Sequence, residues 1–168
     1  MSIKLDSLTE RYTVHRLTRD DLPALLALCR TNPLYYQHMH LQPTLENLAE
    51  NLTALPPGKA AADKYFVGFW QGEKLAAILD LITGYPAPTT AFFGWFMLDA
   101  AYQGAGEGSR LLQELLRGLR AAGFQRVRLA YIKGNPQSEH FWRKNAFFPT
   151  GEEPAAERYT LVVVQRLL

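Results

Sequence analysis

Residues 98–109 have the sequence LDAAYQGAGEGS and connect an apolar stretch to a leucine-rich stretch. The apolar stretch, Thr90–Leu98, predicts a buried central strand. The leucines after the turn recur at helical spacing and predict one apolar helix face: Leu111, Leu112, Leu115, Leu116 and Leu119. A helix that begins after a glycine-rich turn leaves backbone N–H groups without partners at the positive end of its dipole. The turn therefore predicts a site for a ligand phosphate.

The spacing of the glycines distinguishes three phosphate-binding patterns. A P-loop needs Gly-Lys before its Ser or Thr, and Ser109 is not preceded by that pair. A dinucleotide fingerprint needs G-x-G-x-x-G and a later acidic residue, but the next predicted strand, QRVRLAYI, contains no Asp or Glu. The third pattern, Q-x-x-G-x-G, is matched by Gln103, Gly106 and Gly108.

The segments around this turn predict a mixed α/β or α+β organisation. Helices are expected after Asp20-Asp21, after Thr44 as N-cap, and from Asn135-Pro136. The helix after Thr44 is expected to bury its leucines Leu45, Leu48, Leu52 and Leu55. Further strands are expected at residues 12–17, 64–70, 74–83, 125–132, 147–150 and 159–167. With 168 residues and no repeat or linker, the chain predicts one domain over residues 12–168, preceded by an N-terminal extension, residues 1–11.

Composition restricts the class of partner. Lys and Arg number 18 against 16 Asp and Glu, so no broad basic face is expected and no nucleic acid is predicted as a partner. The single cysteine, Cys29, rules out an internal disulfide and a Cys-built metal cluster, and no metal is expected. No apolar run approaches the roughly 20 residues that span a bilayer. The N-terminus has no apolar signal segment. We therefore expect a cytoplasmic protein without a membrane partner.

The glycine turn resembles the signature loop of the GNAT superfamily of acyl-CoA-dependent N-acetyltransferases, (Q/R)-x-x-G-x-(G/A). A second stretch is similar to the pattern N-x-x-A-x-x-L-Y-x-x-x-G-F that members often carry; the corresponding residues here are Asn135, Ser138, Phe141, Trp142, Ala146 and Phe147. Ala146 replaces the usual glycine, which is compatible with a negative φ at that position. The resemblance implies a GNAT-like fold, with a single mixed, mostly antiparallel sheet of about seven strands, flanking helices and a splayed central pair.

The resemblance also implies acetyl-CoA as co-substrate, bound between the splayed strands. Its pantetheine arm would pair with the backbone of Phe96, Met97 and Leu98, and Asn135 would lie near that arm or act only as a helix N-cap. Its pyrophosphate would meet the amides of the turn: Gln103, Gly104, Ala105, Gly106, Glu107, Gly108 and Ser109. The Glu107 side chain is expected to face away from the phosphates.

The expected reaction is direct attack of a primary amine on the thioester in a ternary complex. This reaction needs no enzyme nucleophile, so Cys29 is expected to be a small core residue. The backbone amide of Leu98 is the expected donor to the tetrahedral oxyanion.

Proton transfer has several candidates. Trp142 stands where many relatives have tyrosine, and an indole N–H cannot act as a proton-transfer acid. Either Tyr131, the best local substitute, or a water is therefore expected to act instead, or the thiolate leaves unprotonated; the alternative for Tyr131 is a role in the core or the pocket wall. Asp80, within an apolar strand, and His38 are candidate proton acceptors, with His40 as a second relay. The alternatives are a structural partner for Asp80 and solvent exposure for the histidines.

The acceptor pocket is expected between the first two helices and the loop after residue 83. Its candidate residues are Tyr35, Tyr36, His38 and Tyr85, which would suit a small-molecule amine. Alternatively, the tyrosines pack the helices onto the sheet. An acetyltransferase for a protein N-terminus or lysine would need an open groove. A non-catalytic CoA-binding module is a third hypothesis, and a homodimer is compatible with the sequence.

Overall fold

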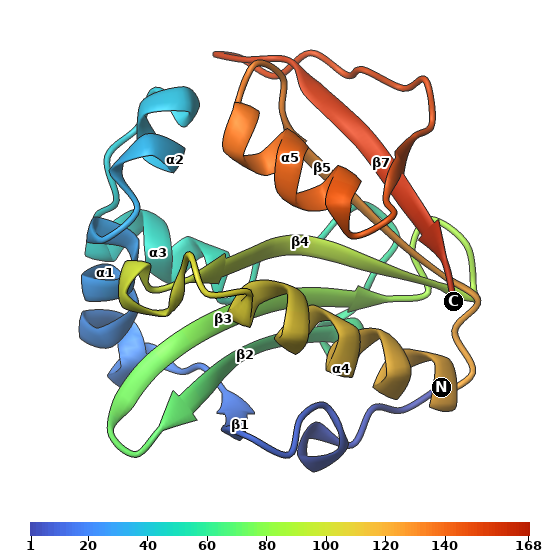
Figure 1. Cartoon of the computed structure of the whole chain (residues 1–168), viewed down its shortest axis with the longest axis horizontal. Coiled ribbons are helices and arrows are strands. Elements are labelled where there is room, and N and C mark those ends of the chain that lie inside the picture. The colour runs from blue at the N-terminus through green and yellow to red at the C-terminus, as the bar shows by residue number, and fades with distance from the viewer.

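The backbone is organised around one seven-stranded sheet, and the computed structural model describes all residues, 1–168 (Figure 1). The strands are β1 (Thr13–Arg16), β2 (Lys64–Gln71), β3 (Lys74–Thr83), β4 (Thr90–Leu98), β5 (Arg126–Ile132), β6 (Phe148–Pro149) and β7 (Leu161–Leu167). Their order is β1-β2-β3-β4-β5-β7-β6. Only β4 and β5 are parallel. The expected mixed, mostly antiparallel sheet of seven strands is confirmed.

Five α-helices cover the two faces of the sheet. α1 (Leu22–Arg30), α2 (Pro33–Met39) and α3 (Leu45–Asn51) pack on one face, and α4 (Glu107–Ala121) and α5 (Pro136–Lys144) on the other. Four 3-10 turns connect them: η1 (Leu5–Ser7), η2 (Arg19–Asp21), η3 (Ala61–Asp63) and η4 (Ala100–Tyr102). None of the helices combines the length and apolarity that crossing a bilayer requires.

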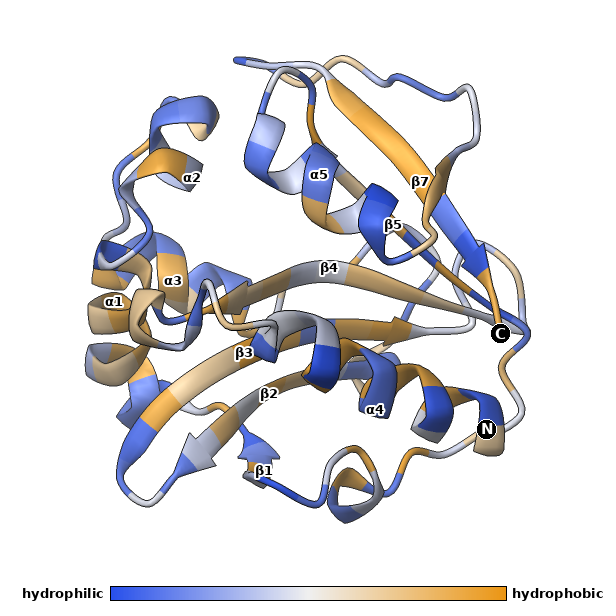
Figure 2. Ribbon diagram, viewed as in Figure 1, coloured by the Kyte–Doolittle hydropathy of each residue, from blue (hydrophilic) through white to orange (hydrophobic).

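The sheet separates two hydrophobic cores because side chains alternate along each strand. On β3, Leu79 and Leu81 join the core under α4, whereas Ile78 joins the core under α1–α3. The predicted apolar face of α4 is buried against the sheet, and its polar face is exposed (Figure 2). The core under α4 also contains Ile3 and Leu8. Residues 1–11, expected as an extension, therefore pack into the body of the domain.

Some local expectations are wrong. Residues 33–39 form the helix α2, where a connector was expected, because Pro33 occupies the first turn and needs no N–H partner there. In α3, Thr44 accepts a hydrogen bond from the Asn47 amide as the expected N-cap. However, only Leu48 of its leucines is fully buried, and Leu45 is 48% exposed. The last two strands are each two residues shorter than predicted, which leaves β6 with two residues.

The expected splay between the central strands is present. β4 and β5 pair only from Thr90–Arg126 to Phe93–Leu129. On its other side β4 pairs with β3, and there Gly94 is an extra residue: Leu81 lies opposite Phe93 and Asp80 opposite Trp95. Such a bulge bends its strand and ends regular pairing. The strands diverge from this point, and β5 turns away from β4 (Figure 1).

Candidate active site

A cleft of about 350 Å³ opens where β4 and β5 diverge. Nearly all the residues expected to bind the cofactor line it: Phe96, Met97, Leu98, Gln103, Gly104, Gly106, Glu107, Gly108, Ser109, Asn135 and Trp142. Ala105 does not. The lining also includes residues that sequence reasoning did not assign to the site: Asn32, Gln137, Ser138, His140, Phe141 and Lys144. The cleft therefore brings together the two stretches that carry the resemblance, 103–109 and 135–147.

The glycine turn leaves the first amides of α4 free. Gly104 and Gly106 have φ values of 88° and 79°, which a residue with a Cβ rarely adopts. Gly106 is the N-cap and offers no side chain, and the first helical bond runs from the Arg110 amide to the Gly106 carbonyl. The amides of residues 107–109 therefore have no partner within the helix and can bind an anion.

Gly108 is required for a different reason. A Cβ on Gly108 would lie 3.2 Å from the Phe141 ring. The absence of a side chain therefore lets the first turn of α4 approach α5 closely.

The exposed edge of β4 presents backbone groups to the cleft. The Asp99 amide donates to the Ala76 carbonyl at 2.9 Å. Successive residues of a strand point their backbone groups to opposite edges, so this bond shows which residues of β4 are bonded to β3. The backbone groups of Met97 consequently face β3, and those of Phe96 and Leu98 face the opposite edge, toward the cleft. The Leu98 amide thus has the orientation expected of an oxyanion donor. The expected pairing of Met97 backbone with the cofactor is wrong, because β3 uses those groups.

A side-chain amide network fixes the end of β4. The Leu98 carbonyl accepts hydrogen bonds from Asn32 Nδ2 at 2.9 Å and from Gln103 Nε2 at 2.8 Å. Gln103 Nε2 also lies 2.8 Å from Asn32 Oδ1, and Gln137 Nε2 lies 3.4 Å from Gln103 Oε1. Gln103 therefore connects the end of β4 and Asn32, which follows α1, to the glycine turn. Nothing in the local sequence around Asn32 indicates these distant partners.

Asn135 acts as the N-cap of α5. Its Oδ1 accepts from the amides of Gln137 and Ser138 at 3.2 and 3.3 Å. The side chain is almost fully buried while the residue still borders the cleft. The N-cap role is confirmed.

The wall of the cleft on the α5 side is aromatic. Phe96 stacks on Phe141 with ring centres 6.1 Å apart, and the Trp142 ring lies 5.9 Å from Phe96 and 5.0 Å from Phe147. Trp142 is 7% exposed, so most of its surface belongs to the core. Ala146, just after α5, has φ 61°, so the negative φ that would make alanine easily tolerated in place of glycine is not present: this residue occupies the left-handed position that often ends a helix.

Asp80, expected as a proton acceptor, forms a buried ion pair. Both of its carboxylate oxygens lie 2.8 Å from Lys64 Nζ, which also donates to the Ala54 carbonyl at 2.8 Å. Burial raises the pKa of Asp80, and Lys64 only partly offsets that effect. Asp80 does not line the cleft. Its Oδ2 lies 3.1 Å from where a Cβ on Gly94 would stand, beside the bulge at which the strands part.

The other expected proton carriers lie away from the cleft lining. Tyr131 pairs with Val162 on β7 and packs against the core under α4, and burial raises the pKa of its hydroxyl. His38 lies within α2, and His40 at its C-terminal end. The structure therefore places neither histidine nor Tyr131 in the lining of the cleft.

Of the expected acceptor residues, only Tyr35 lines the cleft. Its ring is stacked on Trp95 with centres 6.1 Å apart, and burial raises the pKa of its hydroxyl. The buried Trp95 Nε1 has no hydrogen-bond partner. Tyr36 is 5% exposed and belongs to the core under α1–α3, and Tyr85 packs edge-on against Phe92. The alternative that the tyrosines pack the helices thus holds for Tyr36.

Cys29 is a core residue, as expected. It is fully buried beside Tyr36, and burial raises the pKa of its thiol to about 11. A thiol in this state is a poor nucleophile at neutral pH.

Comparison with known proteins identifies the family of this chain. The model of the acetyltransferase (GNAT) family matches residues 24–147, so the chain belongs to this family of acyl-CoA-dependent N-acetyltransferases. No curated protein sequence matches the chain.

Three solved structures illustrate the shared fold. An acetyltransferase from Thermus thermophilus has a TM-score of 0.74 and 23% identity, and the match covers 95% of this chain and 100% of that one. An acetyltransferase from Salmonella typhimurium that modifies the N-terminal serine of a 50S ribosomal protein has a TM-score of 0.71 and 19% identity, over 96% and 97% of the two chains. The PaiA N-acetyltransferase from Thermoplasma acidophilum, in complex with coenzyme A, has a TM-score of 0.66 and 17% identity, over 93% and 98%.

Proposed function

We propose that this acetyltransferase transfers the acetyl group of acetyl-CoA to the primary amine of a small molecule, by direct attack in a ternary complex. The observation that carries the choice of acceptor is the aromatic side of the cleft, where Tyr35 stacks on Trp95. The loop between β6 and β7 is joined to the end of α2 by a hydrogen bond from Arg158 Nη1 to the His40 carbonyl, at 3.0 Å. These contacts narrow the acceptor side, and a narrow side favours a small acceptor over a folded protein.

In this proposal the cofactor uses mostly backbone groups. The pantetheine arm extends the sheet at the free edge of β4, pairing with the backbone of Phe96, because the Leu98 carbonyl already accepts hydrogen bonds from Asn32 and Gln103. The pyrophosphate lies on the free amides of residues 107–109. Lys144, at the end of α5 and in the lining of the cleft, adds a positive charge for the phosphates.

The transfer itself breaks one bond and forms another at the acetyl carbon. The neutral amine attacks the thioester carbonyl, and the Leu98 amide donates to the oxygen that becomes negative. Collapse of this intermediate releases the CoA thiolate and leaves an amide. The proton lost by the amine goes to Asp80 through water, because Asp80 does not itself line the cleft. Because the aromatic wall at Trp142 carries no proton-transfer acid, the thiolate takes its proton from solvent or from Tyr131.

A protein or peptide N-terminus is the second candidate acceptor. It is favoured by one specific observation: several of the structural neighbours acetylate ribosomal proteins. A peptide acceptor would require the Arg158–His40 contact to open, because an extended chain must pass out of the cleft between α2 and the loop.

Thiol release from acetyl-CoA distinguishes these acceptors. We expect turnover with members of a panel of small primary amines and little with peptides that present a free N-terminus. Turnover on peptides alone would overturn the choice of acceptor. Tight binding of CoA without turnover on either panel would indicate a non-catalytic CoA-binding module.

A further inference from the structure

Glu107 presents an electrostatic problem for the proposed site. It is the first residue of α4 and lines the cleft beside the amides that would hold the pyrophosphate. A free carboxylate there would repel a phosphate, since two like charges within a few ångströms and little water interact strongly.

The structure neutralises this carboxylate from outside the cleft. Oε1 of Glu107 lies 2.5 Å from Arg11 Nη1 and accepts a hydrogen bond from Tyr12 Oη at 2.6 Å, and its Oε2 lies 3.1 Å from Arg110 Nη2. Burial alone would raise the pKa of Glu107, but the hydrogen bond from Tyr12 and the charges of Arg11 and Arg110 outweigh it and lower that pKa. The carboxylate is therefore ionised, matched in charge and turned toward the N-terminal segment.

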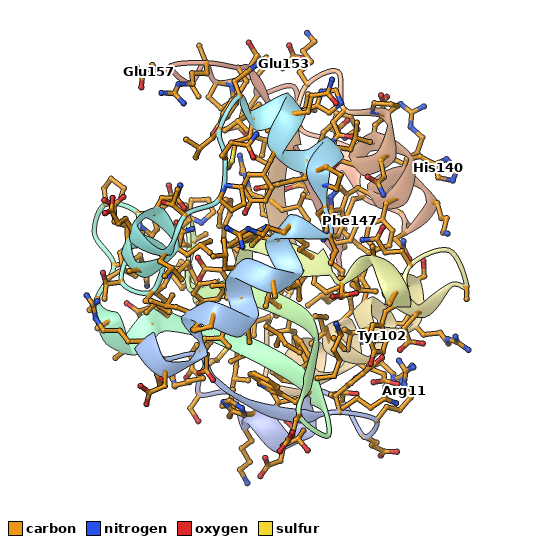
Figure 3. The ribbon with its side chains drawn as sticks, turned by 90° about the vertical axis from the view of Figure 1, so that its left-hand side faces the viewer. Arg11, Tyr102, His140, Phe147, Glu153 and Glu157 are labelled. Atoms are coloured by element: carbon orange, nitrogen blue, oxygen red, sulfur yellow. The ribbon has the colours of Figure 1, made fainter.

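Arg11 is itself held in place along α4. Its Nε lies 2.6 Å from Oε1 of Glu114, which is two turns beyond Glu107 on the same helix. The Arg11 amide donates to Thr9 Oγ1 at 3.1 Å, and the Thr9 hydroxyl donates to the other oxygen of Glu114. Figure 3 shows Arg11 on the same side of the molecule as Tyr102, which lies just before the glycine turn.

We propose that Arg11 is a positioning residue for cofactor binding: with Tyr12, it draws the Glu107 carboxylate aside and cancels its charge at the phosphate-binding turn. The N-terminal segment thereby controls the affinity for the pyrophosphate, although Arg11 itself lies outside the lining of the cleft. This inference rests on the proposed position of the pyrophosphate.

Calorimetric titration with CoA at low and high salt tests the proposal. Arg11→Met should weaken CoA binding about tenfold at low salt, and the loss should shrink at high salt because screening reduces the repulsion from Glu107. Adding Glu107→Gln to Arg11→Met should restore the affinity to within about twofold, since no charge is then left to repel the phosphate. Arg128→Met is the matched control: it removes the arginine of another ion pair, that with Glu152, neither of which lines the cleft, and should leave CoA binding unchanged.

A second variant covers the case in which Arg11→Met does not fold. Glu107→Gln in the otherwise unchanged protein should bind CoA as well as or a few-fold more tightly, because Arg11 and Arg110 then face the phosphates unopposed. If the ion pair between Arg11 and Glu107 only holds the N-terminal segment against α4, Glu107→Gln should instead weaken CoA binding. Failure of the unchanged protein to bind CoA would contradict the proposed function. Normal binding with no loss in Arg11→Met, or a loss that Glu107→Gln does not restore, would overturn only the role of Arg11.

Discussion

On the proposed cofactor side of the cleft, the groups available for binding are backbone amides of β4 and α4, whereas on the proposed acceptor side they are side chains, chiefly Tyr35 stacked on Trp95. The cofactor side needs a bulge at Gly94, positive φ at Gly104 and Gly106, and a strand edge left unpaired. The acceptor side depends on the rings of Tyr35 on α2 and Trp95 on β4 and on the carboxylate of Asp80 on β3. Substitutions should therefore act on the cofactor side through backbone conformation and on the acceptor side through lost side-chain contacts.

The largest effect is expected on the acceptor side at Asp80. Asp80→Asn should lower kcat by about 100-fold if this carboxylate accepts the amine proton. Only the ionised form can accept a proton and burial raises its pKa, so kcat/KM should rise with pH through a value above that of an ordinary aspartate. The asparagine variant should lose this limb of the pH profile.

The ion pair with Lys64 requires a control for folding. Removing one partner of a buried pair costs about 3 kcal/mol or more of stability, because the other charge is left unpaired. The double variant Lys64→Met/Asp80→Asn removes both charges and should be more stable to heat than Asp80→Asn. If the double variant folds and keeps the kcat of the unchanged protein, Asp80 is structural and another group takes the proton.

The next effect is expected on the cofactor side at Gly106. Gly106→Val should weaken CoA binding by about 30-fold, since a β-branched residue at positive φ costs on the order of 1–3 kcal/mol and distorts the turn. Gly58 has the same φ of 79° in a remote turn. Gly58→Val should thus lose similar stability but bind CoA normally. Equal CoA affinities for the two variants, measured by calorimetry, would argue against the turn as the binding site.

A smaller effect is expected at Tyr35. Tyr35→Ala should raise the KM for the amine about tenfold through loss of the stack on Trp95, an aromatic contact and its buried area being worth roughly 1–2 kcal/mol. Tyr35→Phe keeps the ring and should remain within about twofold. Initial rates at saturating acetyl-CoA give both values. An unchanged KM in Tyr35→Ala would remove this residue from the acceptor site.

The smallest effect is expected at Asn32, which supports the cofactor side through a side chain. Asn32→Ala removes one of two hydrogen bonds to the Leu98 carbonyl, and Gln103 retains the other. A net hydrogen bond of about 1 kcal/mol corresponds to roughly fivefold weaker CoA binding. Asn47→Ala, a helix-cap change outside the cleft, provides the comparison; an equal loss there would show that Asn32 acts only through stability.

The two sides also differ in how well the sequence predicted them. The cofactor side follows from short local patterns: Gly106 and Gly108 lie at the predicted turn into α4, and Asn135 is the predicted N-cap of α5. The predicted pairing of the Met97 backbone failed because pairing with the neighbouring strand β3 decides which way its backbone groups face, and the end of α5 decides the left-handed φ of Ala146. Asp80 was singled out correctly as a costly charge in an apolar strand, but its partner Lys64 lies on another strand and was not found.

The acceptor side depends on contacts between distant segments. Tyr36 and Tyr35 are adjacent in sequence, yet one points into the core and the other stacks on Trp95 at the cleft. The two side chains point in different directions because residues 33–39 form the helix α2, and no helix was predicted there. Likewise, the link from Arg11 to Glu107 spans almost a hundred residues and has no local signal.

Amide hydrogen exchange, followed by NMR with and without CoA, tests the central claim most directly, because it reports on each backbone group separately. The account predicts that CoA slows exchange at the amides of Leu98, Glu107, Gly108 and Ser109, with no comparable change at Met97, whose amide already faces β3. Saturation with CoA that leaves those four amides unchanged, while protection appears elsewhere in the protein, would contradict it.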